Sequence, residues 1–467
     1  MSENSTQGDT ICAISTPFGM GAIAMIRLSG IQAIHICNKV FIPNNKNTDI
    51  TNVSSHTSHF GKIFSDDKTL LDEVIVSVFK NPHSYTGEDI VEISCHGSVY
   101  IQEQLLQLLI RNGARSAKAG EFTLCAFLNG KLDLAQAEAV ADLISSDSNA
   151  AHKLAINQMK GGFSEQIKLL RNQLVEFTAM LELELDFSEE DVEFANRENL
   201  AKLLTNISTE VSALLESYSL GNVLKSGIPV AIIGKPNVGK STLLNILLNE
   251  DRAIVSEIPG TTRDAIEDTM IINGVCFRFI DTAGLREATD KIEHIGIERT
   301  YEKIAKASII IYLFDICEDN IDDIKIAVNE IKAKAGDGAR IILVANKTDK
   351  LIEEPKGFAE IVEFDTIFIS AKRRENINLL TARLLRAVND DLANISSTVV
   401  TSSRHYEALH HSMDSLAEAS DALANGVSND LLAEHIRTAL HHLGEITGDI
   451  TTEEILDSIF SKFCIGK

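Results

Sequence analysis

The hydrophobic pattern of the chain changes near residue 130. The first 122 residues contain short apolar runs rich in β-branched residues, at Ala22–Leu28, Glu73–Phe79 and Ile90–Ser94. Such runs are typical of β-strands, whereas the stretch Gln102–Arg111 has helical spacing. From Leu132 to about Ser219, apolar residues instead recur every three and four positions, which is the spacing of one helix face. The sequence therefore predicts an α/β domain followed by helices.

Strand-like apolar runs return between residues 226 and 389, and helical spacing resumes after them at Leu409, Met413 and Leu416. One helical domain interrupted by an inserted α/β domain explains the two helical flanks better than two unrelated bundles. The predicted fold is therefore a multidomain combination of α/β and α. Its segments are an N-terminal α/β domain at 1–125, a helical part at 126–225, the inserted domain at 226–389 and a second helical part at 390–467.

Composition and charge exclude several classes of protein. The net charge of −24 argues against a stand-alone nucleic-acid binder, which usually presents a basic face. The best basic cluster, formed by Arg111, Arg115, Lys118 and Lys131, is expected to be a solvated surface. No apolar run reaches the roughly 18 residues of a membrane span, the N-terminus is polar, and the seven cysteines include no CxxC pair. We therefore expect a cytoplasmic protein with no membrane span, disulfide framework or zinc site.

One segment of the inserted domain has the spacing of a phosphate-binding loop. Residues Ile233–Ser241 read IGKPNVGKS, and they lie between the apolar run Val230–Ile233 and the helical stretch Thr242–Leu248. Glycines allow backbone N–H groups to converge on phosphate oxygens, and the N-terminus of the helix adds positive potential. Lys240 can reach the β and γ phosphates, and Ser241 can bind Mg²⁺. The segment predicts a site for a nucleoside triphosphate.

Two further motifs indicate contacts to the γ-phosphate. TTRD, at residues 261–264, offers a threonine hydroxyl as a second Mg²⁺ ligand. DTAG, at residues 281–284, follows the apolar strand Val275–Ile280; Asp281 can hold Mg²⁺ through water, and the Gly284 amide can meet the γ-phosphate. The dipeptide Asn273-Gly274 just before this strand predicts a tight hairpin turn.

A motif later in the chain selects the base. Asn346-Lys347-Thr348-Asp349 follows the strand Ile341–Ala345, and Asp349 can accept two hydrogen bonds from guanine, at N1–H and the exocyclic amine. Adenine offers no such donors, so the carboxylate would be left unpaired. Ser370-Ala371-Lys372 follows the strand Thr366–Ile369 and can close over the base. In this order the motifs resemble the translation-factor class of GTPases.

Leu285 departs from the pattern of many Ras-like GTPases, which place a glutamine there to orient the attacking water. A leucine has no polar group, so another residue or another chain must position the water. Glu287, Asp290 and Glu293 are the candidates in the following segment. On charge alone, each of the three is more simply a solvated loop residue.

Motifs outside the inserted domain narrow the family. They are SYTGED at 84–89 with Glu92 and HG at 96–97, GEFT at 120–123, AFLNGKLDLAQAEA at 126–139 and CIGK at 464–467. The chain resembles, nearly end to end, the tRNA-modification GTPase MnmE (TrmE) family. Ala119 stands where that family usually has proline, a minor departure in a loop. The resemblance implies a folate-binding N-terminal α/β domain, a discontinuous helical domain and an inserted Ras-like P-loop GTPase domain.

The resemblance also implies a second ligand. The N-terminal domain of the family forms the homodimer and binds a reduced folate, 5-formyl- or methylene-tetrahydrofolate, as one-carbon donor. By motif position the folate contacts would be Arg27, Glu92, Lys131 and Lys467. A pterin suits a carboxylate and the folate glutamate suits cations, although each of these residues alone is as consistent with a surface ion pair. Cys464 could act near the one-carbon chemistry or be a packed terminal thiol.

The family further implies how GTP and its metal ions are held. Its GTPase domains pair when potassium bridges the phosphates, and Glu293 would be the catalytic residue that orients water in place of Leu285. The K⁺ ligands would be the side chain of Asn237 and the backbone of Ser256, Ile258 and Thr261, and the Mg²⁺ ligands would be Ser241 and Thr262. Ser256 replaces the more usual threonine, which a carbonyl ligand tolerates. The expected GTP contacts are Asn237, Val238, Gly239, Lys240, Ser241, Thr242, Ser256, Glu257, Ile258, Pro259, Gly260, Thr261, Thr262, Asp281, Thr282, Ala283, Gly284, Asn346, Lys347, Thr348, Asp349, Ser370, Ala371 and Lys372.

The implied function is the potassium-activated, GTP-hydrolysing half of a complex that modifies tRNA. In that heterotetramer, an FAD-dependent subunit joins the homodimer, and together they add an aminomethyl-type group such as carboxymethylaminomethyl to carbon 5 of the wobble uridine. Two alternatives stay open: an assembly GTPase acting on ribosomal RNA, and a folate-dependent one-carbon enzyme in which GTP is only regulatory. The acidic charge speaks against the first, and methylene transfer by this chain alone would support the second.

Overall fold

The computed structural model describes residues 8–45, 47–186, 197–250, 268–280, 305, 307–335, 339–351, 365–392 and 399–467. They belong to two compact units. Unit 1 consists of Met1–Ala141, Gln158–Ala195 and Gly426–Lys467, and unit 2 consists of Asp142–Asn157 and Asn196–Asn425. Each unit therefore joins stretches of chain that are distant in sequence.

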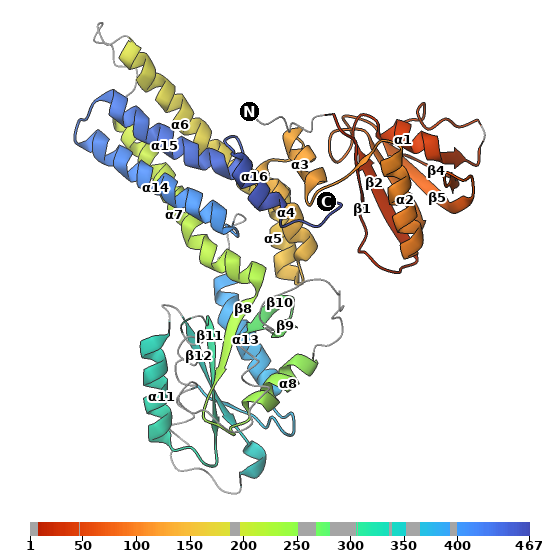
Figure 1. Ribbon diagram of the computed structural model, residues 1–467. Helices are drawn as coiled ribbons and strands as arrows, with labels where there is room; N and C mark the ends of the chain where they lie inside the picture. Colours follow the sequence, from red (N-terminus) through yellow and green to blue (C-terminus); the bar gives the residue numbers. More distant parts are fainter. Residues whose placement is uncertain are drawn as a thin grey trace. The chain divides into compact units, whose positions relative to one another are not determined.

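A seven-stranded sheet forms the first part of unit 1. Its strands are β1 (Ile11–Ile14), β2 (Ile23–Ser29), β3 (Phe41–Pro43), β4 (Thr57–Phe64), β5 (Leu70–Phe79), β6 (Ile90–His96) and β7 (Arg115–Ser116). They lie in the order β3-β4-β5-β6-β2-β1-β7, and all neighbours are antiparallel except β1 and β7. Helices α1 (Ala33–Val40) and α2 (Val99–Arg111) cover one face of this sheet (Figure 1).

The alternation of side chains along the strands explains this arrangement. In β5, Val74, Val76 and Val78 are buried in one core with Leu105 and Leu109 of α2. Residues between them face the opposite side, because successive side chains of a strand point to opposite faces. The predicted strands correspond to β2, β5 and β6 and the predicted helix to α2, whereas β1, β3, β4, β7 and α1 were not predicted.

The remaining helices of unit 1 come from both sides of the inserted domain. They are α3 (Glu121–Leu128), most of α4 (Leu134–Ser145), α6 (Gly162–Asp186), α15 (Asn429–Thr447) and α16 (Glu453–Phe460). Helices α6 and α15 lie side by side (Figure 1). An ion pair between Arg437 and Glu182, at 2.6 Å, and a hydrogen bond from Asn429 to Glu184, at 2.9 Å, join them. Within unit 1, a helix that precedes the inserted domain therefore packs against one that follows it.

Unit 2 contains a six-stranded sheet. Its strands are β8 (Ile228–Ile233), β9 (Asp268–Ile272), β10 (Val275–Phe279), β11 (Ile309–Asp315), β12 (Arg340–Asn346) and β13 (Ile367–Phe368), in the order β13-β12-β11-β8-β10-β9. Only β9 is antiparallel to its neighbour. All residues of β8 and β11 are buried, as expected for parallel strands covered on both faces.

Helices cover both faces of this second sheet. Helices α8 (Lys240–Glu250) and α13 (Ile377–Leu392) share a core with one face, and α11 (Ile321–Lys334) shares a core with the other. This is the doubly wound arrangement that places ligands at the carboxyl ends of the strands. The predicted turn between β9 and β10 is confirmed, since Asn273 and Gly274 have φ of 48° and 81°.

Two further long helices complete unit 2, together with most of α5 (Asn149–Met159) and the 3-10 turn η1 (Thr348–Lys350). Helix α7 (Arg197–Ser226) enters the inserted domain, α14 (Ser403–Ala424) follows it, and the two pack together. Tyr218 and Tyr406 stack between them with ring centroids 4.5 Å apart. None of the helices in the described ranges has the length and apolarity to span a bilayer.

Candidate functional site

The predicted phosphate-binding loop connects the end of β8 to the start of α8. Gly234 and Gly239 have φ of 154° and 103°, and a Cβ atom would lie 2.0 Å from the Leu313 carbonyl oxygen at the first and 2.4 Å from Nδ2 of Asn346 at the second. Only glycine fits both positions. The ammonium of Lys240 donates hydrogen bonds to the carbonyl oxygens of Gly234, at 2.7 Å, and Lys235, at 2.8 Å. The lysine therefore lies across the loop that should hold the phosphates.

The buried side chain of Asn346 joins three of the predicted motifs. Its Nδ2 donates to the carbonyl oxygen of Val238 in the phosphate-binding loop, at 2.8 Å. Its Oδ1 accepts from the backbone N–H of Ala371, at 2.9 Å. Asn346 is itself the last residue of β12. The side-chain amide of Asn346 thus connects the phosphate-binding loop, its own Asn346–Asp349 motif and the Ser370–Lys372 motif.

Asp349 lies close to this junction. Its Oδ1 accepts a hydrogen bond from Oγ of Ser370 at 2.7 Å. That hydrogen bond lowers the pKa of the Asp349 carboxyl below its usual value. Like any aspartate with a pKa well below 7, the group is ionised at neutral pH and can act only as an acceptor. An ionised acceptor is what the N1–H and exocyclic amine of guanine require.

Several predicted GTP and metal contacts lie outside the described residues. They are Ser256, Glu257, Ile258, Pro259, Gly260, Thr261, Thr262, Asp281, Thr282, Ala283, Gly284 and Glu293. The remaining predictions fall on described residues. Ser241 and Thr242 lie in the first turn of α8, and Asn237 has φ of 62° in the loop before it.

A second candidate site lies in unit 1, where Arg27 on β2 is the direct cross-strand partner of Glu92 on β6. Nη2 of Arg27 is 2.8 Å from Oε1 of Glu92, and the two side chains are 15% and 20% exposed. The guanidinium also lies over the rings of Tyr85 and Phe122, each centroid 5.6 Å away. Burial raises the pKa of the Tyr85 phenol, which hydrogen-bonds Thr123. The pair is therefore framed by aromatic rings and still reachable from solvent.

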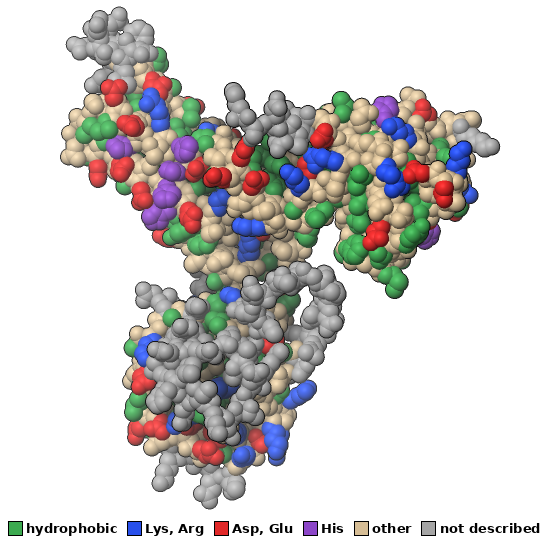
Figure 2. Space-filling view, in the orientation of Figure 1, with side chains coloured by type: hydrophobic (Ala, Val, Ile, Leu, Met, Phe, Trp, Pro, Cys, Tyr) green, Lys and Arg blue, Asp and Glu red, His purple; other side chains and the backbone are tan. Residues whose placement is uncertain are grey.

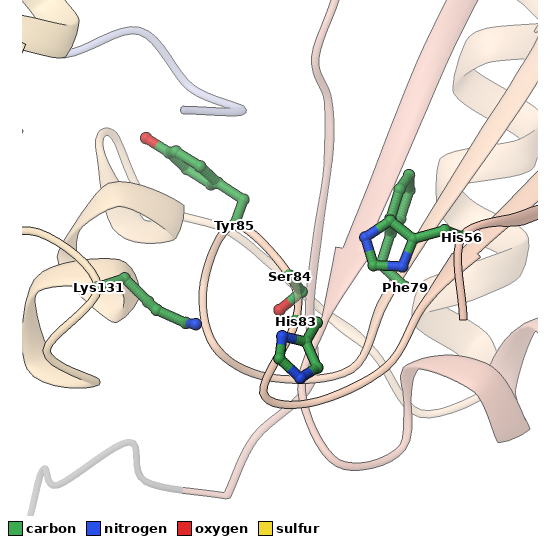
Figure 3. Close-up of a pocket in the computed structure, with 6 residues that line it drawn as sticks. All are labelled: His56, Phe79, His83, Ser84, Tyr85 and Lys131. Carbon is green, nitrogen blue, oxygen red and sulfur yellow. The ribbon is translucent and has the colours of Figure 1, made fainter. Parts of the chain in front are cut away.

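Tyr85 extends this site into a pocket of about 400 Å³. The pocket is lined by His56, Phe79, His83, Ser84, Tyr85 and Lys131. In Figure 3 the ammonium of Lys131 points toward the loop that carries His83 and Ser84, and the rings of His56 and Phe79 lie against each other. His56 and His83 were not predicted, because each stands alone in the sequence without a motif around it.

The C-terminal residues are bound to the same domain. The carbonyl oxygen of Lys467 accepts a hydrogen bond from the N–H of Phe122 at 3.2 Å, and that of Gly466 accepts one from Ser15 at 3.2 Å. Ile465 forms an antiparallel bridge with Ala119. Arg27 and Glu92 thus lie beside Tyr85 and Phe122, Lys131 lines the pocket with Tyr85, and the backbone of Lys467 contacts Phe122. Cys464 is exposed, so the alternative that it is a packed terminal thiol is wrong.

The doubly wound sheet, its glycine-shaped phosphate loop and the junction at Asn346 define a P-loop GTPase domain. Comparisons with known proteins extend this beyond one domain. Residues 10–131 match the family model described as GTP-binding protein TrmE N-terminus, and residues 134–464 match that of the MnmE helical domain. The chain belongs to the MnmE family of tRNA modification GTPases.

Full-length relatives support this membership. The tRNA modification GTPase MnmE of Cytophaga hutchinsonii is 54% identical over 460 residues, covering 98% of each chain. Those of Christiangramia forsetii and Flavobacterium psychrophilum are each 51% identical, covering 98% of this chain and 99% of theirs. Among solved structures, the G domain of the T. maritima FeoB iron transporter matches 34% of this chain and 98% of its own, with 22% identity and a TM-score of 0.25.

Proposed function

We propose that the chain is the GTP-hydrolysing subunit of a cytoplasmic complex that modifies the wobble uridine of tRNA at carbon 5. The added group is of the aminomethyl type, such as carboxymethylaminomethyl, and a reduced folate supplies the one-carbon unit. The observation that carries this proposal is the Arg27–Glu92 pair with its adjoining pocket in a chain that also has a guanine-nucleotide site. A GTPase with no second substrate would have no need of such a site.

The chemistry of the N-terminal site suits a folate. Glu92 offers a carboxylate to the N–H groups of a pterin, and the partly exposed ring of Tyr85 offers a flat surface beside it. Lys131 on the pocket wall suits the glutamate carboxylates of the ligand. The pocket volume of about 400 Å³ falls within the range of small-molecule sites. In this proposal Lys467 is the fourth contact, held near the others by the bound C-terminal tail.

GTP would be held by the residues predicted from the motifs. Lys240 would turn from the loop carbonyls to the β and γ phosphates, Ser241 and Thr262 would hold Mg²⁺, and Asp349 would recognise guanine. K⁺ would bind the side chain of Asn237 and the backbone of Ser256, Ile258 and Thr261, and would pair two GTPase domains. Glu293 would then orient the attacking water. Replacing K⁺ with the smaller Na⁺ should therefore lower GTP turnover without lowering GTP affinity.

The open face of the N-terminal sheet supports a homodimer. Phe60 on β4 and Ile75 on β5 are direct cross-strand partners, and they are 48% and 47% exposed. Ile42 on the neighbouring strand is 57% exposed. Large hydrophobic side chains grouped on one face of a sheet are characteristic of protein–protein interfaces. The FAD-dependent subunit would be the second protein partner and tRNA the substrate.

The ribosomal-RNA alternative gains no support from the basic cluster. Arg111 pairs with Asp66 at 2.8 Å, and Arg115 pairs with Glu121 at 2.6 Å and with Asp9 at 3.1 Å. Basic and acidic side chains are also interspersed over the visible surface of the N-terminal domain (Figure 2). Phosphate backbones require unneutralised cations, so these arginines are poorly suited to bind RNA.

Reconstitution tests the proposal. The experiment combines the chain with an FAD-dependent partner subunit, unmodified tRNA, GTP, K⁺ and methylene-tetrahydrofolate. The tRNA is then digested, and its nucleosides are analysed by mass spectrometry. The proposal expects a modified wobble uridine only when every component is present. Methylene transfer by this chain without the partner would support the one-carbon alternative instead. Co-sedimentation with ribosomes that depends on a GTP analogue, without tRNA modification, would support an assembly GTPase.

A further inference from the structure

Two aspartates with little-exposed side chains lie between the nucleotide motifs of unit 2 without belonging to any of them. Asp315 ends β11, and Asp319 lies in the short loop before α11. Their side chains are 3% and 6% exposed. The loop folds around them: Oδ2 of Asp319 accepts from the N–H of Asp315 at 2.8 Å, and Oδ1 of Asp315 accepts from the N–H of Cys317 at 3.0 Å. The two carboxylates are therefore fixed by the backbone of their own loop.

Each aspartate pairs with a lysine of a different motif. Oδ1 of Asp319 is 2.8 Å from Nζ of Lys235, the residue after the first glycine of the phosphate-binding loop. Oδ2 of Asp315 is 2.6 Å from Nζ of Lys347, the residue after Asn346 in the guanine motif. One loop of chain thus contacts the phosphate-binding and the guanine-binding segments at once. The exposed Asp323 on α11 adds a second contact to Lys235 at 3.0 Å.

The burial of the side chains indicates which partner of each ion pair fixes the position of the other. A buried carboxylate that loses its partner is costly, whereas a lysine that is half exposed can be solvated by water. Lys235 is 50% exposed and Lys347 is 21% exposed, so both lysines are more accessible than the aspartates. The aspartates, which their own backbone fixes, therefore set the positions of the lysines.

Both lysines occupy backbone positions that matter for nucleotide binding. The carbonyl oxygen of Lys235 accepts a hydrogen bond from Lys240, the lysine expected to reach the phosphates. Lys347 has φ of 68°, a left-handed conformation that non-glycine residues rarely adopt, and it lies between Asn346 and the base-selecting Asp349. Its ion pair with Asp315 helps to hold that conformation and raises the pKa of Lys347. Displacing either lysine would shift one half of the nucleotide site relative to the other.

We propose that Asp315 and Asp319 are positioning residues, which hold the phosphate-binding and guanine-binding segments at a fixed spacing through Lys347 and Lys235. The inference rests on the proposed guanine-nucleotide site, and it assigns no contact with the nucleotide to either aspartate. It differs from a purely structural role in one respect. A structural role lowers stability, whereas the positioning role lowers nucleotide affinity in a protein that is still folded.

The test compares Asp315→Asn, Asp319→Asn and the matched control Asp322→Asn in the full-length protein. Asp322 lies on α11 beside the same loop and is exposed. Dissociation of a fluorescent GDP and single-turnover hydrolysis at saturating GTP are measured for each. We expect each of the first two variants to weaken GDP binding by about 10- to 100-fold, the range for a lost charged contact. GDP should dissociate faster, the hydrolysis rate at saturation should change by less than about threefold because neither aspartate meets the reacting atoms, and Asp322→Asn should resemble the wild type.

A double substitution protects the test against misfolding. Lys235→Gln combined with Asp319→Asn removes both charges together and leaves no buried carboxylate unpaired. Lys235→Gln alone is measured beside it. The proposal expects the double variant to lose no more affinity than Lys235→Gln alone, since that change already breaks the contact with Asp319 as well as the exposed contact with Asp323. Folded variants with wild-type GDP affinity, or losses that simply add, would overturn it. Asp349→Asn distinguishes failure of this proposal from failure of the guanine-nucleotide site on which it rests. If Asp349→Asn leaves the preference for guanine unchanged, the guanine site itself is refuted.

Discussion

The nucleotide site of unit 2 and the Arg27–Glu92 site of unit 1 are built differently from the chain. The phosphate-binding loop and the two base-binding motifs are each a continuous segment of fewer than ten residues at the end of a parallel strand, such as Ile233–Ser241 at the end of β8. The Arg27–Glu92 site is instead assembled from two antiparallel strands, a loop and the C-terminal tail, which are up to 440 positions apart in sequence, from Arg27 to Lys467.

This difference in construction has a physical consequence. The carboxyl ends of parallel strands lie at the same edge of a sheet. Short motifs that follow these strands are therefore brought together by the parallel arrangement alone. Cross-strand partners depend on register, and register depends on the whole sheet. A motif therefore reveals a site of the first kind directly, and a site of the second kind becomes visible only when the fold is known.

The largest expected effect concerns the chemical step at the nucleotide site. Glu293→Ala should lower single-turnover GTP hydrolysis by about 10²–10⁴-fold, the contribution typical of a positioned acid–base group. GTP affinity should barely change, because the residue acts in the transition state. Glu287→Ala, in the same segment, is the matched control and should hydrolyse GTP at close to the wild-type rate. If Glu293→Ala hydrolyses GTP at close to the wild-type rate, Glu293 is a solvated residue and the water is positioned by another group.

The next effect concerns base recognition. Asp349→Asn should lower GTP affinity by about 10²-fold, because an acceptor of two hydrogen bonds is replaced by a group that is half donor. Xanthosine triphosphate should gain affinity over GTP, since its base edge complements the amide. Competition binding measures both. An unchanged preference for GTP over xanthosine triphosphate would contradict the assignment of this motif to base recognition.

These motifs could be predicted from the sequence because their geometry is local. The strand before each motif is a continuous apolar run. Gly234 is required by its positive φ and the nearby Leu313 carbonyl oxygen, and Gly239 by its positive φ and the nearby Asn346 side chain. The sequence could not reveal Asp315 or Asp319, whose pairing with Lys347 and Lys235 depends on which strands are neighbours. Strand β4 was missed for a related reason: Ser58, Gly61 and Lys62 give it little hydrophobic signal.

For the N-terminal site, Arg27, Glu92, Lys131 and Lys467 were named only through the family resemblance. Their separation leaves no pattern that spacing could detect, and the cross-strand register of Arg27 and Glu92 appears only in the sheet. His56 and His83 had no motif at all and were found only as walls of the pocket. The α/β and helical character of the flanking segments, in contrast, followed directly from the period of the hydrophobic residues.

A smaller effect tests the contribution of the C-terminal tail to the second site. Gly466 has φ of 97°, and a Cβ atom there would lie 2.4 Å from the carbonyl oxygen of Ile14. Gly466→Ala should displace the tail and lower folate affinity by about tenfold, because a strained backbone position costs on the order of 1–3 kcal/mol. Gly426→Ala is the matched control, since Gly426 also has positive φ but no atom within 4 Å of the added methyl group. Equal folate affinity in both variants would show that the tail is not part of the site.

The central claim is that one chain carries two separate ligand sites, and Glu92→Gln tests it most directly. The substitution keeps the shape of the side chain but removes the charge that pairs with Arg27. Glu73→Gln is the control, because Glu73 lies on the same sheet and pairs with Lys62 at its surface. Calorimetric titration with 5-formyl-tetrahydrofolate, alongside GTP turnover, should show folate binding lost in Glu92→Gln and retained in Glu73→Gln, with GTP hydrolysis intact in both. Wild-type folate affinity in Glu92→Gln would contradict the account.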